Sequence, residues 1–389
     1  MASIRSFISG FNVDKLSQFI FIVIFFAITT APIVVEVFKV QSPVEKIVEN
    51  RTLALPPNFQ GMATLSASVD QSLKWYNDHF GLRSLLIRIK NQIDYSVFGT
   101  SNRVHIGRDG WLFLRSVIDV EEPRIESMTD ADMDSAIQLI GNLRDFLAKR
   151  NIELVVITNQ MKDRFYPEYV PPSAQFALSR HRFEYFKTKL NELKGITYID
   201  STPLLLQVKT QRQIFHKTDF HWNDPAAFEV AKVLVDHLAD AKKDPNLKWH
   251  LPLGIERKSL SGGEAQFMPL LSPLKEDALL IAPIPPDQAT PVVYEKREPF
   301  EVFHASESTK SLLPPMVVFG DSFMDGVDRS GLPQHVKSEY RARIYHATMN
   351  EILRSMPSDT QYFVFEFIEN ALPNLKNIIG FDAKTVEGK

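Results

Sequence analysis

The chain has 389 residues, a formal net charge of −3, 44% hydrophobic residues and 23% charged residues. This balance is typical of a folded globular protein, and the lack of a basic excess argues against nucleic acid as a partner. The chain contains no cysteine, which excludes disulfides, thiolate metal sites and cysteine nucleophiles.

An uncharged apolar run from Phe19 to Val35 dominates the N-terminus. Extended back to Leu16, it has roughly 20 residues, enough to cross a hydrocarbon core of about 30 Å as a helix. A cleaved signal peptide is one alternative, but the run is long and Pro32 makes a poor cleavage site. A buried core helix is another. We predict a single-pass anchor, although basic residues on both sides leave the orientation signal weak.

The apolar run and the composition of the residues after it divide the chain into segments. We expect 1–15 on the cytoplasmic side, a transmembrane anchor over 16–38 and a polar, proline-bearing linker over 39–72. The remaining residues, 73–389, form one folded domain. Within that domain the proline-rich stretch 245–310 lacks periodicity, so we interpret it as an insertion of loops and short strands.

Two local signals follow the predicted linker. Apolar residues recur at helical spacing between Leu73 and Ile89. Asp109 and Gly110 then stand between two apolar runs, and glycine accepts the positive φ of a tight turn. The pair therefore predicts a β-hairpin.

Helical stretches then alternate with short, continuously apolar strands. Such strands are typical of a parallel sheet covered on both faces, so the order indicates an α/β sandwich with a mostly parallel sheet. The expected elements are helices at 128–150, 181–194 and 225–241, and strands at 152–159, 196–200 and 316–319.

The motif Gly-Asp-Ser ends the last of these strands. Ser322 is expected just past the carboxyl end of a parallel strand, where open α/β sheets place their active sites. A helix starting after Ser322 would direct free backbone N–H groups at the group that its hydroxyl attacks. The alternative is that Asp321 or Ser322 only caps that helix.

The stretch FHKTDFHWNDPAAFEVA carries a second group of polar residues. In an extended segment Asp219 and His221 share one face, with Cα atoms about 6–7 Å apart, while Phe220 points into the core. Asp224 and Pro225 are expected as cap and first helical residue. A carboxylate bound to one imidazole nitrogen fixes the tautomer that lets the other activate a serine.

Two other interpretations of this stretch stay open. His216, Asp219 and His221 form a possible metal site of two imidazoles and one carboxylate. His221 is alternatively a structural histidine without chemistry. Trp222 is expected to be a packed aromatic residue.

Five stretches occur in an order that resembles a known family: WYNDHFGLR, GRDGWLF, TDFHWND, GDSF and FEFIEN. They span Trp75 to Asn370 and are similar to the alginate O-acetyltransferase family of the J and X type. The resemblance implies an SGNH hydrolase-like three-layer sandwich in which the motif order is circularly permuted, because the Asp/His block precedes the serine block. No obvious carbohydrate-binding module follows, so the chain is nearer the membrane-anchored J type.

The resemblance also implies roles for individual residues. Ser322 becomes the nucleophile, His221 the general base and Asp219 its orienting carboxylate. The backbone N–H of Ser322 is the first candidate for the oxyanion donor. By their position at and just beyond the end of a strand, Asn159 and Lys162 are further candidates, as oxyanion donors or substrate-binding residues. A turn residue and a solvated charge are the alternatives for these two.

The function implied is O-acetyl transfer to hydroxyls of an exported exopolysaccharide, alginate-like or other, through an acetyl-serine intermediate and without a cofactor or metal. Acetyl-CoA is cytoplasmic, so a domain held in the periplasm by an inner-membrane anchor needs a membrane-bound O-acyltransferase as donor. An SGNH-type carbohydrate esterase or deacetylase has the same three residues and stays open. So does a catalytically silent, membrane-anchored assembly scaffold.

Overall fold

The computed structural model describes residues 13–39, 44, 47, 52–57, 65–119, 125–179, 181–306 and 311–388. The chain forms two compact units. One consists of Met1–Gly99 with Pro269–Pro273, and the other of Thr100–Met268 with Leu274–Lys389. The larger unit therefore begins at Thr100, whereas the sequence analysis starts the folded domain at residue 73.

The smaller unit is helical where it is described. It contains α2 (Val13–Val37), α3 (Leu65–His79) and α4 (Arg83–Phe98). Helix α3 begins inside the stretch expected to be a linker. The helical spacing predicted after Leu73 is present, but α4 has no buried residue. These helices therefore form outside the core of the sheet unit, which explains the later start of that unit.

Helix α2 carries the apolar run of the N-terminus. Large apolar side chains along it are exposed, among them Phe19, Phe21 and Phe26. In the part of the chain that the structure describes, no helix has both the length and the apolar character needed to cross a membrane. The anchor at 16–38 stays a prediction, and residues 1–12 of the expected cytoplasmic segment lie outside the described residues.

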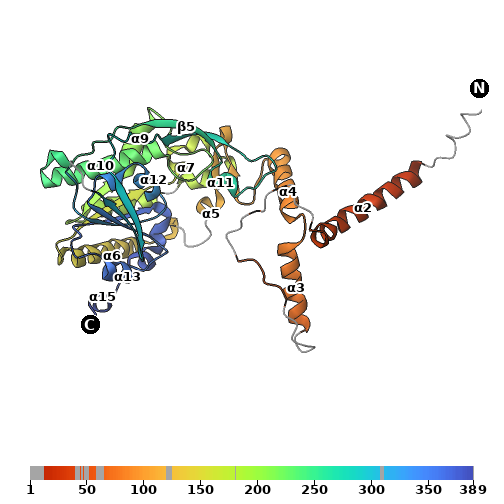
Figure 1. Ribbon diagram of the computed structural model, residues 1–389, viewed down its shortest axis with the longest axis horizontal. Coiled ribbons are helices and arrows are strands. Elements are labelled where there is room, and N and C mark those ends of the chain that lie inside the picture. The colour runs from red at the N-terminus through yellow and green to blue at the C-terminus, as the bar shows by residue number, and fades with distance from the viewer. Residues whose placement is uncertain are drawn as a thin grey trace, which may run out of the picture. The chain divides into compact units, whose positions relative to one another are not determined.

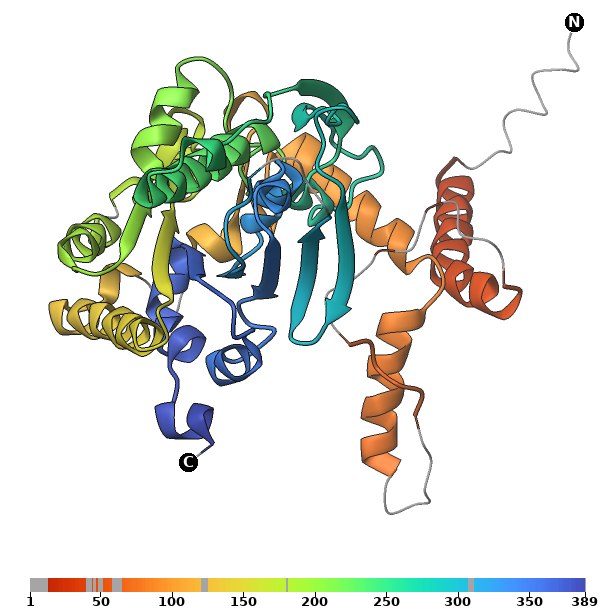
Figure 2. The ribbon, with the colours of Figure 1, turned by 60° about the vertical axis from the view of Figure 1, so that its left-hand side comes forward.

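The larger unit is built on a seven-stranded sheet with the order β4-β3-β11-β9-β10-β8-β7 (Figures 1 and 2). The first five strands are parallel, and β8 and β7 are antiparallel. The mostly parallel sheet of the prediction is confirmed. The strands are β4 (Thr197–Asp200), β3 (Glu153–Asn159), β11 (Tyr362–Ile368), β9 (Met316–Gly320), β10 (Ser338–Arg343), β8 (Phe300–Ala305) and β7 (Val292–Arg297).

Two apolar clusters, one on each face of this sheet, make the unit a three-layer sandwich. Successive side chains of a strand point to opposite faces. On β3, Val155 and Ile157 join one cluster and Leu154 and Val156 join the other. Helix α10 (Asp224–Lys242) contributes to the first cluster. The second cluster receives side chains from α6 (Asp130–Ala148), α8 (Arg182–Glu192) and α13 (Met349–Ser355).

The predicted hairpin is present in the larger unit. Strands β1 (Val104–Ile106) and β2 (Leu112–Leu114) pair antiparallel. The turn between them has Asp109 at φ 53° and Gly110 at φ 80°. Both residues lie in the left-handed region, as the Asp-Gly signal requires.

The stretch 245–310 differs in part from the expected insertion. Strands β5 (Ile255–Leu260) and β6 (Glu276–Ile281) form a separate antiparallel pair. However, β8 and β7 extend the central sheet. The remaining helices are α5 (Arg115–Ile118), α7 (Lys162–Phe165), α9 (Ser201–Lys209), α11 (Gly263–Gln266), α12 (Met324–Arg329), α14 (Leu375–Ile379) and α15 (Ala383–Glu387).

Candidate active site

Three neighbouring parallel strands end at one edge of the sheet. Strand β9 ends at Gly320, β3 at Asn159 and β11 at Ile368. Ser322 follows two residues after the end of β9, and helix α12 begins at Met324. Ser322 therefore lies at the carboxyl edge of the sheet, where this class of fold places its sites.

The segment that carries Asp219 and His221 is a closed loop, and the expectation of an extended segment is wrong. Phe215 and Trp222 form an isolated antiparallel bridge, which closes the loop at its base. The backbone N–H of His221 donates to Asp219 Oδ1 at 3.0 Å. This local hydrogen bond bends the chain, as aspartate side chains do in turns. The half-buried ring of Phe220 packs against the apolar core, as expected, and also lies beside the ring of His221, with centroids 3.9 Å apart.

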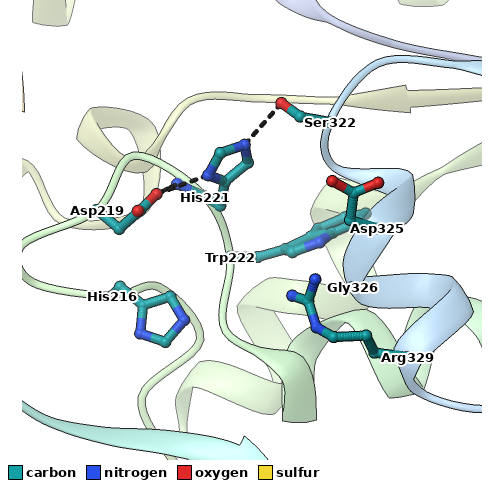
Figure 3. A pocket seen from close by; sticks show the side chains of 8 residues that line it. All are labelled: His216, Asp219, His221, Trp222, Ser322, Asp325, Gly326 and Arg329. Atoms are coloured by element: carbon teal, nitrogen blue, oxygen red, sulfur yellow. Dashed lines mark hydrogen bonds and ion pairs between the residues drawn. The ribbon is translucent and has the colours of Figure 1, made fainter. Parts of the chain in front are cut away.

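Asp219, His221 and Ser322 meet in one hydrogen-bonded row (Figure 3). His221 Nε2 lies 2.6 Å from Ser322 Oγ. The other ring nitrogen, Nδ1, lies 2.6 Å from Asp219 Oδ1. With Nδ1–H donating to the carboxylate, Nε2 is left as the acceptor for the serine hydroxyl.

The carboxyl group of Asp219 is held in its ionised form. Burial by itself raises the pKa of Asp219. The hydrogen bond and charge of His221 and the backbone N–H groups of Gly263 and His221 outweigh burial, so the pKa lies well below its usual range. Gly263 N–H donates to Asp219 Oδ2 at 2.6 Å. The carboxylate is thus available to orient His221 at any physiological pH.

A buried ion pair supports the loop from beneath. Lys162 is 1% exposed, and its Nζ donates to the backbone oxygens of Asp219 at 2.8 Å and Lys217 at 3.2 Å. It also pairs with Glu264, a fully buried residue of α11. Burial raises the pKa of Glu264 to about 7, although Lys162 opposes this shift. Lys162 therefore fixes the backbone that carries Asp219.

Further contacts hold the same loop from the stretch after β5. Glu276 accepts from the backbone N–H groups of Lys217 and Thr218, at 2.8 Å each. A Cβ atom on Gly262 would lie 2.5 Å from the backbone oxygen of Thr218. Only glycine allows this approach. The stretch interpreted as an insertion thus supplies direct supports of the site.

A pair of carboxyl groups supports the turn that carries Ser322. Glu366 on β11 accepts from the backbone N–H of Asp321 at 2.9 Å and from Asn159 Nδ2. Asp321 accepts from the backbone N–H groups of Phe323 at 2.8 Å and Ile368 at 2.9 Å. Burial raises the pKa of both carboxyls, that of Glu366 well above its usual range. The ends of β9, β3 and β11 are thereby tied together.

Trp222 joins the two halves of the site. It is 2% exposed, and its Nε1 donates to the backbone oxygen of Phe323 at 3.0 Å. A Cβ atom on Gly326 would lie 3.0 Å from Trp222 Nε1 and 2.8 Å from Ala227 Cβ. Trp222 is therefore a packed aromatic residue, as expected, and it fixes the distance between the histidine loop and α12.

Asn159 and Lys162 do not line the pocket at Ser322, although the sequence analysis offers them as oxyanion or substrate candidates. Asn159 is 1% exposed and its amide donates to Glu366. Lys162 is committed to backbone oxygens and to Glu264. Asn159 at the end of β3 and Lys162 at the start of α7 therefore support the site from within the core.

The alternative metal site is not formed. Among the described residues, no group of three or more histidine, aspartate and glutamate side chains is arranged to hold a metal ion. Both oxygens of Asp219 already accept hydrogen bonds from protein N–H groups. His216 Nδ1 lies 4.0 Å from Glu276.

A pocket of about 230 Å³ opens beside Ser322. Its lining includes two residues that the sequence analysis does not single out, Asp325 and Arg329, both on α12 (Figure 3). Arg329 pairs with Asp224 at 2.7 Å.

The cap of α10 is Asn223, whose Oδ1 accepts from Ala226 N–H at 3.0 Å. The expected cap Asp224 is therefore the first helical residue, and its carboxylate holds Arg329.

Comparison with known proteins finds one family model that matches part of the chain. The family model described as "SGNH hydrolase-like domain, acetyltransferase AlgX" matches residues 104–258. The match contains Asp219 and His221 and ends before Ser322. The chain is 28% identical over 221 residues to a "Probable alginate O-acetylase AlgJ" of Azotobacter vinelandii. That alignment covers 55% of this chain and 53% of the relative, so the chain spans about half of the relative's length.

A second relative is covered more fully. The "Probable alginate O-acetylase AlgJ" of Pseudomonas putida is 24% identical over 335 residues, which are 80% of this chain and 81% of the relative. The solved O-acetyltransferase domain of Pseudomonas putida AlgJ is 20% identical. It matches with a TM-score of 0.42 over 74% of this chain and 99% of that domain, and at this TM-score the likeness carries no argument about function. The predicted resemblance to the alginate O-acetyltransferases of the J and X type is confirmed by the family model and by these AlgJ relatives.

Proposed function

We propose that this protein is an O-acetyltransferase that acetylates hydroxyls of an exopolysaccharide through an acetyl-Ser322 intermediate. The observation that carries the proposal is the row Ser322 Oγ–His221 Nε2 and His221 Nδ1–Asp219 Oδ1, with 2.6 Å at each step. The names of the AlgJ relatives support the choice of acetyl transfer to a polysaccharide.

The first half-reaction acylates the serine. Ser322 Oγ attacks the carbonyl carbon of the acetyl donor while His221 Nε2 takes the hydroxyl proton. Asp219 accepts from Nδ1–H and stabilises the imidazolium that forms. The bond between the carbonyl carbon and the donor oxygen then breaks, and the leaving group takes the proton from Nε2.

The oxyanion of the tetrahedral intermediate needs a donor near Ser322. The backbone N–H of Ser322 is the candidate we favour, because no described residue accepts a hydrogen bond from it. A backbone N–H of the nucleophile's own turn is a common solution. In the second half-reaction a sugar hydroxyl gives its proton to His221 Nε2 and attacks the acetyl-serine. Ser322 Oγ leaves and recovers the proton.

The partners and the location belong to the same proposal. We propose a membrane-bound O-acyltransferase as acetyl donor, and attachment to the inner membrane through residues 16–38 with the catalytic unit in the periplasm. Exposed apolar side chains along α2 support attachment. Fractionation of cells that express the full chain tests it: recovery only in the soluble fraction contradicts the proposal.

The purified full chain tests the activity. It is mixed with a chromogenic acetyl ester, with and without oligosaccharides prepared from alginate and from cellulose, and the sugars are analysed by mass spectrometry. Acetylated sugar supports the transferase. Release of acetate that no acceptor changes points to an esterase. Turnover equal to that of Ser322→Ala points to a scaffold without catalysis.

A further inference from the structure

The pocket beside Ser322 contains polar side chains that acyl transfer to the serine does not use. His216 lies at the start of the loop that carries Asp219, and Arg329 lies at the end of α12. Figure 3 shows both on the side of the pocket away from Ser322. Asp325 completes this polar wall.

His216 is buried without a full set of hydrogen bonds. The residue is 8% exposed, and its Nδ1 has no hydrogen-bond partner in the described part of the chain. Nδ1 lies 4.0 Å from a carboxylate oxygen of Glu276, which is beyond hydrogen-bond reach. The side chain of His216 also lines the pocket beside Ser322.

The imidazole of His216 is held neutral. Burial lowers its pKa from the ordinary value, against the opposing charges of Glu276, Asp219 and Asp224 and with the help of Lys162. A neutral imidazole has one donor nitrogen and one acceptor nitrogen. It is therefore suited to a hydroxyl, which both donates and accepts.

Arg329 is oriented at the mouth of the same pocket. Its Nε and Nη2 donate to Asp224 Oδ1 at 3.2 Å and 2.7 Å. The side chain of Asp224 is 7% exposed, whereas that of Arg329 is 58% exposed. Within the described residues Nη1 makes no hydrogen bond, so one arm of the guanidinium is fixed and the other is available.

The negative charge of the third polar side chain in this wall is neutralised by its ion-pair partners. Asp325 pairs with Arg341 and Arg343, so the pocket does not present an isolated negative charge. An acetyl methyl group cannot form hydrogen bonds with the donors and acceptors that remain. A sugar ring with several hydroxyls satisfies them, since each hydroxyl is both a donor and an acceptor.

We propose that His216 and Arg329 form the subsite that binds the acceptor sugar, with a ring hydroxyl on His216 Nε2 and a sugar oxygen on Arg329 Nη1. This inference rests on the proposed function. It assigns the two residues to the second half-reaction, in which the hydroxyl attacks acetyl-Ser322. Formation of the acetyl-enzyme does not require them.

A burst experiment with the full chain separates the two half-reactions. The first turnover of a chromogenic acetyl ester reports acetylation of Ser322. The acceleration of steady turnover by oligosaccharides from alginate and from cellulose reports the acceptor. In His216→Ala and Arg329→Ala we expect an unchanged burst, with the acceptor concentration for half-maximal acceleration raised about 5- to 10-fold, as for loss of one hydrogen bond.

Matched variants complete the experiment. His237→Ala on the exposed side of α10 and Arg257→Ala, whose side chain is 66% exposed in an ion pair with Asp277, should leave both readings unchanged. Arg329→Lys keeps the positive charge but loses the planar guanidinium, which can bind Asp224 and the sugar at the same time. It should therefore behave like Arg329→Ala.

Unchanged acceptor dependence in all the pocket variants would overturn the subsite. Loss of the burst in these variants without a change in acceptor dependence would overturn it too. A wild-type chain without any burst, or with a burst followed by steady turnover that no acceptor accelerates, contradicts the proposed function itself.

Discussion

The two halves of the candidate active site are supported by different chemistry. Beneath the histidine loop, Lys162 and Glu264 form a buried pair of opposite charge type. Beneath the serine turn, Asp321 and Glu366 are two buried carboxyl groups, and among the described residues neither forms an ion pair. Of the two supports, only the first pairs its carboxyl group with a cation.

The two supports differ in the protonation of their buried groups. A lysine beside a glutamate stabilises the ionised form of both groups, whereas two neighbouring buried carboxyls favour the retention of a proton. Burial nevertheless raises the pKa of Glu264 to about 7, so we expect both halves to be sensitive to pH, and the histidine half to be sensitive also to the loss of one partner of its ion pair.

The largest expected effect on the rate of transfer comes from removing Ser322 Oγ, the atom where the two halves meet. Ser322→Ala removes the hydroxyl that His221 contacts, and we expect transfer to fall about a thousandfold or more. Acetylated oligosaccharide measured by mass spectrometry reports the rate, and circular dichroism confirms that the variant is folded. Substantial transfer by a folded Ser322→Ala protein would rule out this nucleophile.

The ion pair beneath the histidine loop gives the next largest effect. Lys162→Met leaves Glu264 buried without its partner, which typically costs about 3–5 kcal/mol in the free energy of unfolding. Urea unfolding measures the loss. In the double variant Lys162→Met with Glu264→Leu, most of it should be recovered, since no charge is then left unpaired. A double variant as unstable as the single one would show that the pair is not the support described here.

Glu366 tests the support of the serine turn. Glu366→Ala leaves Asn159 Nδ2 and the backbone N–H of Asp321 without their acceptor, at about 1–3 kcal/mol for each buried group. Glu366→Gln keeps an acceptor oxygen and should lose less stability and less activity. The comparison fails if the two variants are equally stable in urea.

Gly326 tests the contact between the halves. A Cβ atom in Gly326→Ala meets Trp222 Nε1 at 3.0 Å, so α12 must move away from the histidine loop. We expect a loss of about 1–3 kcal/mol in stability, as for other overpacked sites, together with slower transfer. An active and fully stable variant would show that the spacing set by Trp222 is not needed.

The smallest expected effect is the dependence of stability on pH. Burial raises the pKa of Asp321 and Glu366, so the folded state retains protons that the unfolded chain releases. Their contribution is greatest below the ordinary carboxyl pKa of about 4 and declines as pH rises through the raised values. Glu366→Gln should flatten this decline. An unchanged pH profile would contradict the proton retention described for these two carboxyls.

Asp219 contributes to the profile with the opposite sign. Its pKa is lowered in the folded state, so its contribution is present above the ordinary carboxyl pKa and is lost as pH falls towards the lowered value. Asp219→Asn should remove this acid-side loss while leaving the decline assigned to Glu366 unchanged.

The sequence predicts the central residues because their signals are local. Asp219 and His221 lie two residues apart, and Ser322 follows an apolar strand that ends in glycine. The parallel sheet follows from alternating helices and apolar strands. The sequence predicts only three of the seven strands, so β10 and β11, like β7 and β8, are not predicted as sheet members. The polar strand β7 has the composition of an exposed edge strand.

The supports of the site are harder to read from sequence. Lys162 and Glu264 are 102 residues apart. In the sequence each resembles an ordinary solvent-exposed charged residue, because only the fold brings the two together. Glu366 did carry a signal. It is the single acid within the otherwise apolar strand YFVFEFI, and a charge in a central strand is rarely buried without a partner.

The most direct test of the central claim is the covalent intermediate. The full chain is mixed with a chromogenic acetyl ester, quenched in acid within the first turnover and analysed by mass spectrometry as intact protein and as peptides. We predict a mass gain of one acetyl group on the peptide that contains Ser322, absent from Ser322→Ala. Acetyl on another residue, or chromophore release by the wild type with no acetylated protein at any time, would contradict the account.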